Sequence, residues 1–172
     1  MRMIFFFIGF LFIFIDWPIA LLSGTLDVFP NLVGYLLILR GAQVLKAESR
    51  HFSLVMLVCA VLGTVSAAEL VLSLLGLLSN STLAAVLSLV MTLAFLYLSY
   101  EIYKGTKEME ARRNRPIGAD KLLTAWGFLC LGSLFVYVPL FLPSMYLTCV
   151  LLQLLSYGWF EYSLYLIFSK TR

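Results

Sequence analysis

Four polar residues that could bind a cation lie in sequence that is otherwise strongly apolar. They are Asp16, Asp27, Asn31 and Glu69, and we expect them to share a layer in the outer half of the membrane that contains no Lys or Arg. An ionised carboxylate in hydrocarbon costs several kcal/mol, so such a residue faces the protein interior or an aqueous cavity and commonly marks a functional pathway. We therefore expect these acids to be protonated, to hold a cation, or to line a water-filled vestibule.

A second group of polar residues could form a contact inside the protein. Arg40 lies six residues before Lys46, or ~9 Å along a helix, so it sits inside an apolar segment. We expect it to share a polar contact with Glu161 or Glu101, and Tyr157 lies on the same helical face as Glu161. The alternative is that Arg40 extends its charged end out to the lipid headgroups.

The composition of the chain indicates the elements that must position these residues. Of the 172 residues, 62% are hydrophobic and 12% are charged, whereas an average soluble domain is about one quarter charged. A membrane-spanning helix needs about 20 mostly apolar residues. Six apolar runs are present, near residues 3–22, 31–46, 52–78, 82–103, 121–142 and 144–168. The prediction is an all-α integral membrane bundle of six transmembrane helices in three hairpins, with a short second helix, forming one domain over residues 1–172.

The basic residues give the orientation. Six alternating spans place every Lys and Arg on one side, and the loops near residues 23–30, 79–81 and 142–144 contain none. Because Lys and Arg are enriched in cytoplasmic loops, both termini are predicted to be cytoplasmic. An alternative for the first run is a signal peptide, although the following ALLSGT is a poor cleavage site. The phenylalanines of this run point all round a helix, which suggests that it faces lipid.

The depth of the four candidate residues supports a common site. Counting 1.5 Å per residue places Asp16 ~21 Å from the cytoplasmic boundary and Glu69 ~27 Å from it, so the four share an outer-half layer. Pro18 predicts a break in the first helix, which would bring Asp16 within roughly 10 Å of Asp27 beside a cavity. The alternative is that Asp27 and Asn31 only cap the second helix.

The connection at residues 104–121 carries much of the charge of the chain. We expect the fourth helix to continue into it, because Glu108 and Arg112 are spaced i,i+4 and no helix breaker precedes Pro116. Asp120 could then cap the fifth helix. Gly34 is expected to allow the first and second helices to approach closely.

One stretch resembles a known sequence pattern. The string D-V-F-P-N-L-V-G-Y-L-L-I at residues 27–38 is similar to a D-x-x-P-(N/D)-x-x-G-Y-x-L-I pattern of small uncharacterised bacterial membrane proteins. The resemblance implies a multi-pass protein of the bacterial plasma membrane and carries no activity. In size, helix number and terminal orientation the chain also resembles the substrate-binding subunits of energy-coupling-factor vitamin transporters, by architecture alone.

These patterns favour a protein that binds or transports a cation or small solute through an outer-facing polar cavity. Asp16 and Asp27 would be the charge partners, with Asn31 and Glu69 as supporting ligands. The alternatives are a membrane assembly subunit that docks a partner protein through residues 104–121, and a lipid-directed enzyme. The expected partners are membrane lipid and a small solute, without a cofactor and without nucleic acid, because the basic residues form no patch beside aromatics.

Overall fold

The computed structural model describes the backbone of residues 3–23, 29–74, 81–140 and 142–171. Side chains are described for all of these residues except 15–23, 29, 30, 73, 74, 81–85, 140, 143 and 168. The described part is all-α and contains six α-helices and two short 3₁₀ turns. In chain order these are α1 (Ile4–Ser23), α2 (Phe29–Leu45), α3 (Arg50–Leu74), α4 (Ser81–Arg113), α5 (Ala119–Phe135), η1 (Val138–Leu140), η2 (Pro143–Met145) and α6 (Tyr146–Lys170).

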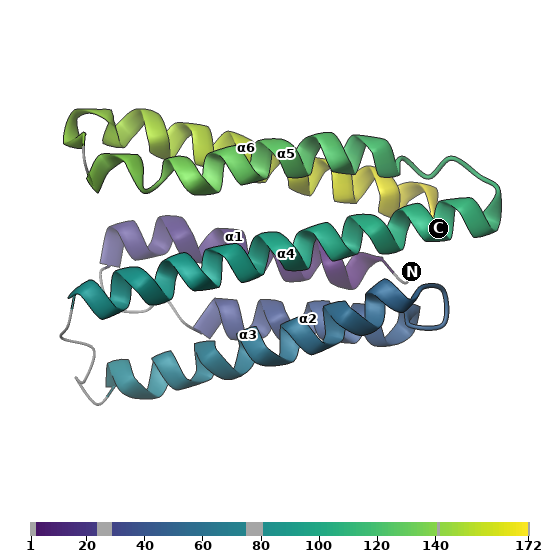
Figure 1. Cartoon of the computed structure of the whole chain (residues 1–172), viewed down its shortest axis with the longest axis horizontal. Helices are drawn as coiled ribbons and strands as arrows, with labels where there is room; N and C mark the ends of the chain where they lie inside the picture. The colour runs from purple at the N-terminus through teal and green to yellow at the C-terminus, as the bar shows by residue number, and fades with distance from the viewer. Residues whose placement is uncertain (1–2, 24–28, 75–80, 141, 172) are drawn as a thin grey trace.

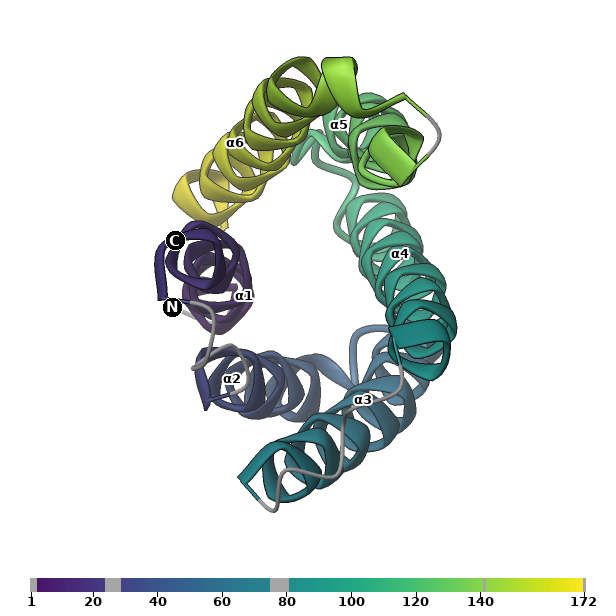
Figure 2. The same ribbon diagram turned by 90° about the vertical axis from the view of Figure 1, so that its left-hand side faces the viewer.

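The six helices form a closed ring. Each helix packs against its neighbours in the chain, and α6 returns to pack against α1. Figure 2 shows this ring end-on, with the helices in sequence order around it. Successive helices run in opposite directions, so both ends of the chain lie at the same end of the ring (Figure 1). The predicted helical bundle of three hairpins is therefore present, and α2 is short, with 17 residues.

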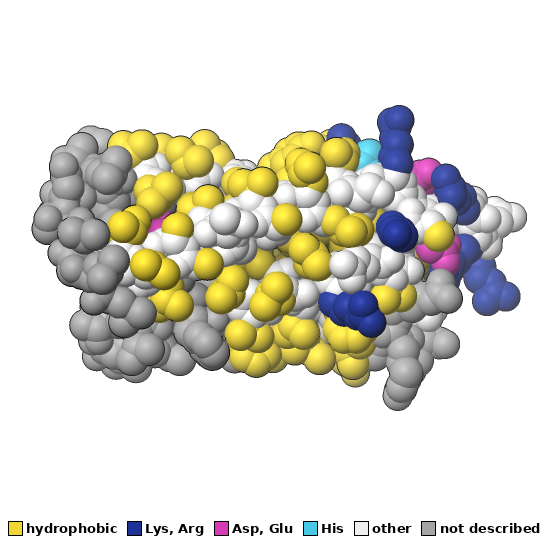
Figure 3. Space-filling model, turned by 90° about the horizontal axis from the view of Figure 1, so that it is seen from below, with side chains coloured by type: hydrophobic (Ala, Val, Ile, Leu, Met, Phe, Trp, Pro, Cys, Tyr) yellow, Lys and Arg dark blue, Asp and Glu magenta, His cyan; other side chains and the backbone are white. Residues whose placement is uncertain are grey.

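The two ends of the ring differ in charge. Lys and Arg side chains gather at the end that holds both chain termini, and apolar side chains cover most of the remaining described surface in this view (Figure 3). We call this the basic end. The opposite end carries η1, η2 and the start of α2 (Figure 1). The Lys and Arg side chains of the described residues therefore gather at one end of the ring, as the sequence pattern predicted.

Many large apolar side chains are exposed on the outside of the ring. Leu57 on α3 is 64% exposed, and Leu147 and Leu155 on α6 are 68% and 73% exposed. By length and composition, two helices in the described residues could cross a membrane, over Arg50–Leu72 and Val86–Arg113. Monomeric soluble proteins rarely leave contiguous apolar surface of this kind uncovered.

Helices α1 and α2 approach each other closely at two glycines. A Cβ atom added to Gly34 would lie 2.5 Å from Ile13 Cγ1 and 2.7 Å from the carbonyl oxygen of Gly9. A Cβ atom on Gly9 would in turn lie 2.8 Å from the carbonyl oxygen of Gly34. Both glycines are therefore required for this backbone contact, and the prediction for Gly34 is confirmed.

Phenylalanines of α1 form much of the core instead of facing lipid. Phe6 and Phe10 are fully buried, and Phe14 is nearly so. The ring of Phe10 packs at 5.5 Å from the ring of Phe95 on α4 and at 5.1 Å from that of Phe160 on α6. Only part of the helix is exposed, since Phe12 is 40% accessible. The lipid-facing prediction was wrong for the buried three, because aromatic pairs across the ring favour their burial.

Two expectations about helix continuity have opposite outcomes. Helix α1 runs uninterrupted through Pro18 to Ser23, so the predicted break does not form. A proline removes only one helical hydrogen bond, and helices in apolar surroundings tolerate this when neighbouring groups compensate. Helix α4 does continue to Arg113, and Arg112 donates to Glu108 at 2.8 Å, as the i,i+4 spacing predicts.

The start of α5 differs from the prediction. Gly118, with a left-handed φ of 112°, occupies the N-cap position, and no side chain caps the helix there. Asp120 lies in the first turn and accepts a hydrogen bond from Lys107 at 2.5 Å. A carboxylate in the first turn still favours the helix through the helix dipole, but the Asp120 cap was wrong.

Candidate functional site

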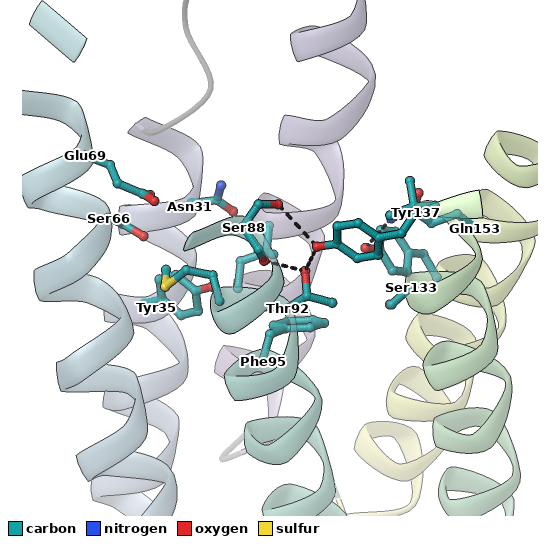
Figure 4. Close-up of a pocket in the computed structure, with 14 residues that line it drawn as sticks. Asn31, Tyr35, Ser66, Glu69, Ser88, Thr92, Phe95, Ser133, Tyr137 and Gln153 are labelled. Atoms are coloured by element: carbon teal, nitrogen blue, oxygen red, sulfur yellow. Dashed lines mark hydrogen bonds between the residues drawn. The ribbon is translucent and has the colours of Figure 1, made fainter. Parts of the chain in front are cut away.

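A polar cavity of 330 Å³ lies inside the ring, and all six helices contribute to its wall. Figure 4 shows its labelled polar side chains converging from facing helices. The lining residues are Ile13, Asn31, Tyr35, Ser66, Glu69, Ser88, Met91, Thr92, Phe95, Ser133, Val136, Tyr137, Gln153 and Tyr157. Asn31 is near the start of α2 and Tyr137 follows the end of α5, so the cavity is on the side of the ring away from the basic end.

Helix α4 and the segment after α5 form one wall through hydroxyl groups. The Tyr137 hydroxyl lies 2.9 Å from Thr92 Oγ1 and 3.3 Å from Ser88 Oγ. Thr92 and Ser88 are four residues apart, so they share one face of α4 (Figure 4). Thr92 Oγ1 also donates to the carbonyl oxygen of Ser88 at 2.9 Å. Tyr137 is therefore held across the cavity by two hydroxyls of one helix.

Helix α6 forms the facing wall. Gln153 Nε2 donates to the Tyr157 hydroxyl at 2.7 Å, and the Tyr157 ring stacks on Phe14 with centroids 4.2 Å apart. Gln153 is 3% exposed, and its carbonyl oxygen Oε1 has no hydrogen-bond partner among the described residues. A buried acceptor without a partner costs on the order of 1–3 kcal/mol. Among the described residues, this wall therefore contains a buried hydrogen-bond acceptor that has no partner.

Helices α2 and α3 form the third wall, which contains the acid. Ser66 and Glu69 are three residues apart on α3 and point toward Asn31 and Tyr35 on α2 (Figure 4). Among the described lining residues, Glu69 is the only carboxylic acid. None of these residues is Lys, Arg or His. The cavity therefore combines one carboxylate with neutral hydroxyl and amide groups.

The chemistry of this lining suits a ligand that donates hydrogen bonds and carries positive charge. Glu69 and Gln153 Oε1 both accept hydrogen bonds, and the carboxylate supplies the charge. A cavity of this volume is at the lower end of the size range for small-molecule sites. The described residues contain no group of three or more His, Cys, Asp or Glu side chains that could hold a metal ion.

Two of the four predicted outer residues line this cavity together. Asn31 and Glu69 come from different helices and lie on the same wall. Asp27 is outside the described residues, and for Asp16 only the backbone within α1 is described. The proposed spacing of Asp16 and Asp27 therefore stays a prediction.

The predicted contact of Arg40 with Glu161 or Glu101 was wrong. Arg40 is exposed, and its Nη1 donates to Gln43 Oε1 at 3.3 Å, one turn along the same helix. A long basic side chain reaches the surface easily, which avoids the cost of burying its charge. Tyr157 packs inward and pairs with Gln153 instead of a carboxylate.

The two glutamates of this predicted contact have very different surroundings. Glu101 is 2% exposed, and its Oε2 lies 2.7 Å from His51 Nδ1 while its Oε1 lies 3.6 Å from Lys104 Nζ. Glu161 is 9% exposed, and neither of its carboxyl oxygens has a hydrogen-bond partner in the described part of the chain. Glu161 lies one helical turn from Tyr157, which links it to the cavity wall.

Several cavity residues were not predicted from sequence. Ser88, Thr92, Tyr137 and Gln153 each lie in a long apolar run, where isolated hydroxyls and amides are common. The one available signal was the i,i+4 spacing of Ser88 with Thr92 and of Gln153 with Tyr157, which places each pair on one helical face. That spacing does not say whether the face points into the ring.

The fold and the cavity together define an all-α ring of six antiparallel helices with an acidic, hydroxyl-rich pocket near one end. No protein family, characterised protein or solved structure matches the chain.

Proposed function

We propose that the chain is a six-span membrane protein that binds a small, positively charged, hydrogen-bond-donating solute in its polar cavity. The observation that carries this proposal is one cavity, built by all six helices, that is lined by Glu69 and by Gln153, whose buried carbonyl oxygen has no hydrogen-bond partner in the described residues. Protein interiors rarely leave a buried acceptor without a partner, and a ligand or water that supplies the missing donor offsets the cost. Access would be from the side away from the basic end.

The surface of the ring supports a membrane setting. The exposed leucines of α3 and α6 lie on the outside, where acyl chains would cover them. Helices α3 and α4 contain segments long and apolar enough to cross the bilayer, and short α2 is 17 residues or ~26 Å long. With the basic end in the cytoplasm, the cavity would open to the outer side.

The lining favours an organic cation, such as a protonated amine, over a divalent metal ion. Calcium usually takes six to eight oxygen ligands, commonly from several carboxylates, whereas the described lining supplies a single carboxylate. The rings of Tyr35, Phe95, Tyr137 and Tyr157 also line the cavity. Aromatic and hydroxyl groups around one acid suit the apolar and N–H parts of an alkylammonium group.

Binding can be tested on the purified protein with a panel of small amines, amino alcohols, and monovalent and divalent cations. We expect at least one protonated amine to raise the unfolding temperature in a saturable way. Glu69→Gln and Gln153→Leu should each weaken that binding by about tenfold or more, since each removes a hydrogen bond to a charged group. Asp120→Asn at an exposed position and Gln43→Leu at a half-buried one make similar changes away from the cavity, and they should not weaken binding.

Two results would contradict the proposal. One is a panel with no saturable ligand while a second protein co-purifies at fixed stoichiometry, which would support the assembly-subunit alternative. The other is equal weakening by Glu69→Gln and Asp120→Asn, which would make the effect one of overall charge.

The topology needs its own test. In a variant with Cys59, Cys130 and Cys149 replaced by alanine, single cysteines at Ser144 and Asn114 probe the two ends of the ring, where both residues are exposed. A membrane-impermeant thiol reagent should label Ser144→Cys in intact cells and Asn114→Cys only after permeabilisation. Labelling of both in intact cells would rule out the six-span arrangement.

A further inference from the structure

A second hollow lies at the basic end of the ring, between the α4–α5 connection and the end of α6. It is a cleft of 780 Å³ lined by Arg113, Arg115, Pro116, Ile117, Lys170 and Thr171. Three of these six residues are basic and none is acidic. The outer cavity contains no basic residue among its described lining, so the two hollows are opposite in charge.

The connection that forms one wall of the cleft has a defined conformation. Helix α4 ends with Asn114 in a left-handed conformation, φ 47°, and the N–H groups of Asn114 and Arg115 donate to the carbonyls of Ala111 and Glu110. This is the Schellman pattern of helix termination. Arg115 is therefore presented from a hydrogen-bonded turn, and Pro116 directly after it restricts the backbone further.

The same connection is also tied back to α4 by a side chain. Glu110 Oε1 accepts hydrogen bonds from the N–H groups of Ile117 at 2.7 Å and Gly118 at 3.2 Å. Across the cleft, Lys170 Nζ lies 3.9 Å from where a Cβ atom on Gly118 would be. The Lys170 ammonium therefore lies beside the turn.

Several other cations at this end have a carboxylate partner. Lys107 pairs with Asp120 and Arg112 with Glu108. Within the cleft, Arg113 pairs with Glu48 at 2.6 Å. Arg115 and Lys170 have no carboxylate within salt-bridge distance in the described residues, although both line the cleft. The cleft therefore holds two cations without a carboxylate partner in the described residues, beside a third that is paired.

We propose that this cleft binds the phosphate of an anionic lipid headgroup. A guanidinium and an ammonium on opposite walls of one cleft suit the oxygens of a phosphodiester, and basic pockets between helices on the cytoplasmic side bind acidic headgroups. The exposed apolar side chain of Pro116 would contact the glycerol region. The inference depends on the membrane setting proposed above, but it is independent of any ligand in the outer cavity.

Native mass spectrometry of the full chain in neutral detergent tests this, with phosphatidylglycerol as the probe and phosphatidylcholine as the neutral comparison. We expect saturable binding of phosphatidylglycerol. The double variant Arg115→Gln/Lys170→Gln should raise its Kd by roughly thirtyfold, from the loss of two basic side chains near the headgroup. It should keep the unfolding temperature of the wild type in phosphatidylcholine, since both side chains are exposed.

The matched control is Arg50→Gln/Lys121→Gln, which removes the same charge from two exposed positions outside the cleft. Its Kd should rise by less than about threefold. Equal weakening of phosphatidylglycerol binding by both double variants would show that the effect comes from the overall positive charge of the basic end. The proposed binding site in the cleft would then be wrong. Saturable binding of inorganic phosphate alone, with the same dependence on Arg115 and Lys170, would identify a free-anion site and overturn the lipid assignment.

Discussion

The outer cavity and the basic end differ in whether their buried polar groups have partners. At the basic end the acids have partners, as in Glu101 with His51, Glu108 with Arg112 and Glu48 with Arg113. At the cavity the buried carbonyl oxygen of Gln153 has none in the described residues, and neither does the nearby Glu161 carboxyl. A satisfied network stabilises the fold, whereas an unsatisfied buried group costs stability and persists where function requires it. The comparison separates paired groups, which hold the ring together, from unpaired buried groups, which cost stability.

The largest expected effect is at Glu101, the most deeply buried acid of the paired set. Glu101→Leu removes a 2.7 Å contact with His51 and the nearby Lys104 charge. Hydrogen bonds to charged groups contribute about 1.5–3 kcal/mol, so the variant should lose about 2 kcal/mol of unfolding free energy. Denaturant unfolding in mixed micelles measures this. His51→Leu in the Glu101→Leu background should add little, because the pair is already broken.

The next prediction makes the same substitution at the unpaired acid. Glu161→Leu removes a buried carboxyl whose two oxygens have no hydrogen-bond partner in the described residues. Burying such a group costs about 1–3 kcal/mol in mutational data, so the variant should gain about 1 kcal/mol of unfolding free energy. A loss as large as that of Glu101→Leu would show that Glu161 is satisfied in the native protein, and the comparison would then fail at its central residue.

Much of the fold could be predicted from the sequence because apolar length and charge position are local properties. The six runs, the short α2, the extension of α4 and the gathering of Lys and Arg at one end all follow from them. Gly34 was also predictable, since a glycine in a helix facing another helix permits backbone contact. These features needed no knowledge of which helix faces which.

The candidate site could be predicted only in part. Asn31 and Glu69 were found because a carboxylate and an amide are rare in such segments, whereas Gln153 and Tyr137 were missed. A helix that is apolar all round has no polar face to indicate its orientation, so the face toward the ring is decided by tertiary packing. The buried phenylalanines of α1 and the exposed Arg40 are errors of the same origin.

The predicted break at Pro18 failed for a different reason. Pro18 predicted a break because its ring and missing N–H oppose the helix locally. The continuous α1 shows that the neighbouring turns and the packing of α2 and α6 against this helix outweigh that local preference. Local sequence patterns therefore predicted the helices correctly. At Pro18 they gave the wrong result, because tertiary contacts there oppose the local preference of the proline.

The smallest expected effect concerns Ser49, which joins two elements of the basic end. Ser49 immediately precedes α3, and its Oγ accepts the N–H of His51 at 3.1 Å while donating to Glu108 Oε2 at 2.5 Å. It is therefore an N-cap that also ties α3 to α4. Replacing an N-cap serine by alanine costs about 1 kcal/mol, so Ser49→Ala should lose about that much unfolding free energy.

Two further substitutions at Ser49 separate its two roles. Asparagine and aspartate both cap helices well, but only asparagine can also donate a hydrogen bond to the Glu108 carboxylate. Ser49→Asn should therefore stay close to the wild type in unfolding free energy, and Ser49→Asp should be less stable because it places two carboxylates together. Urea titrations of the three variants measure the differences. Equal stability of the asparagine and aspartate variants would mean that the contact of residue 49 with Glu108 contributes nothing to the stability of the basic end.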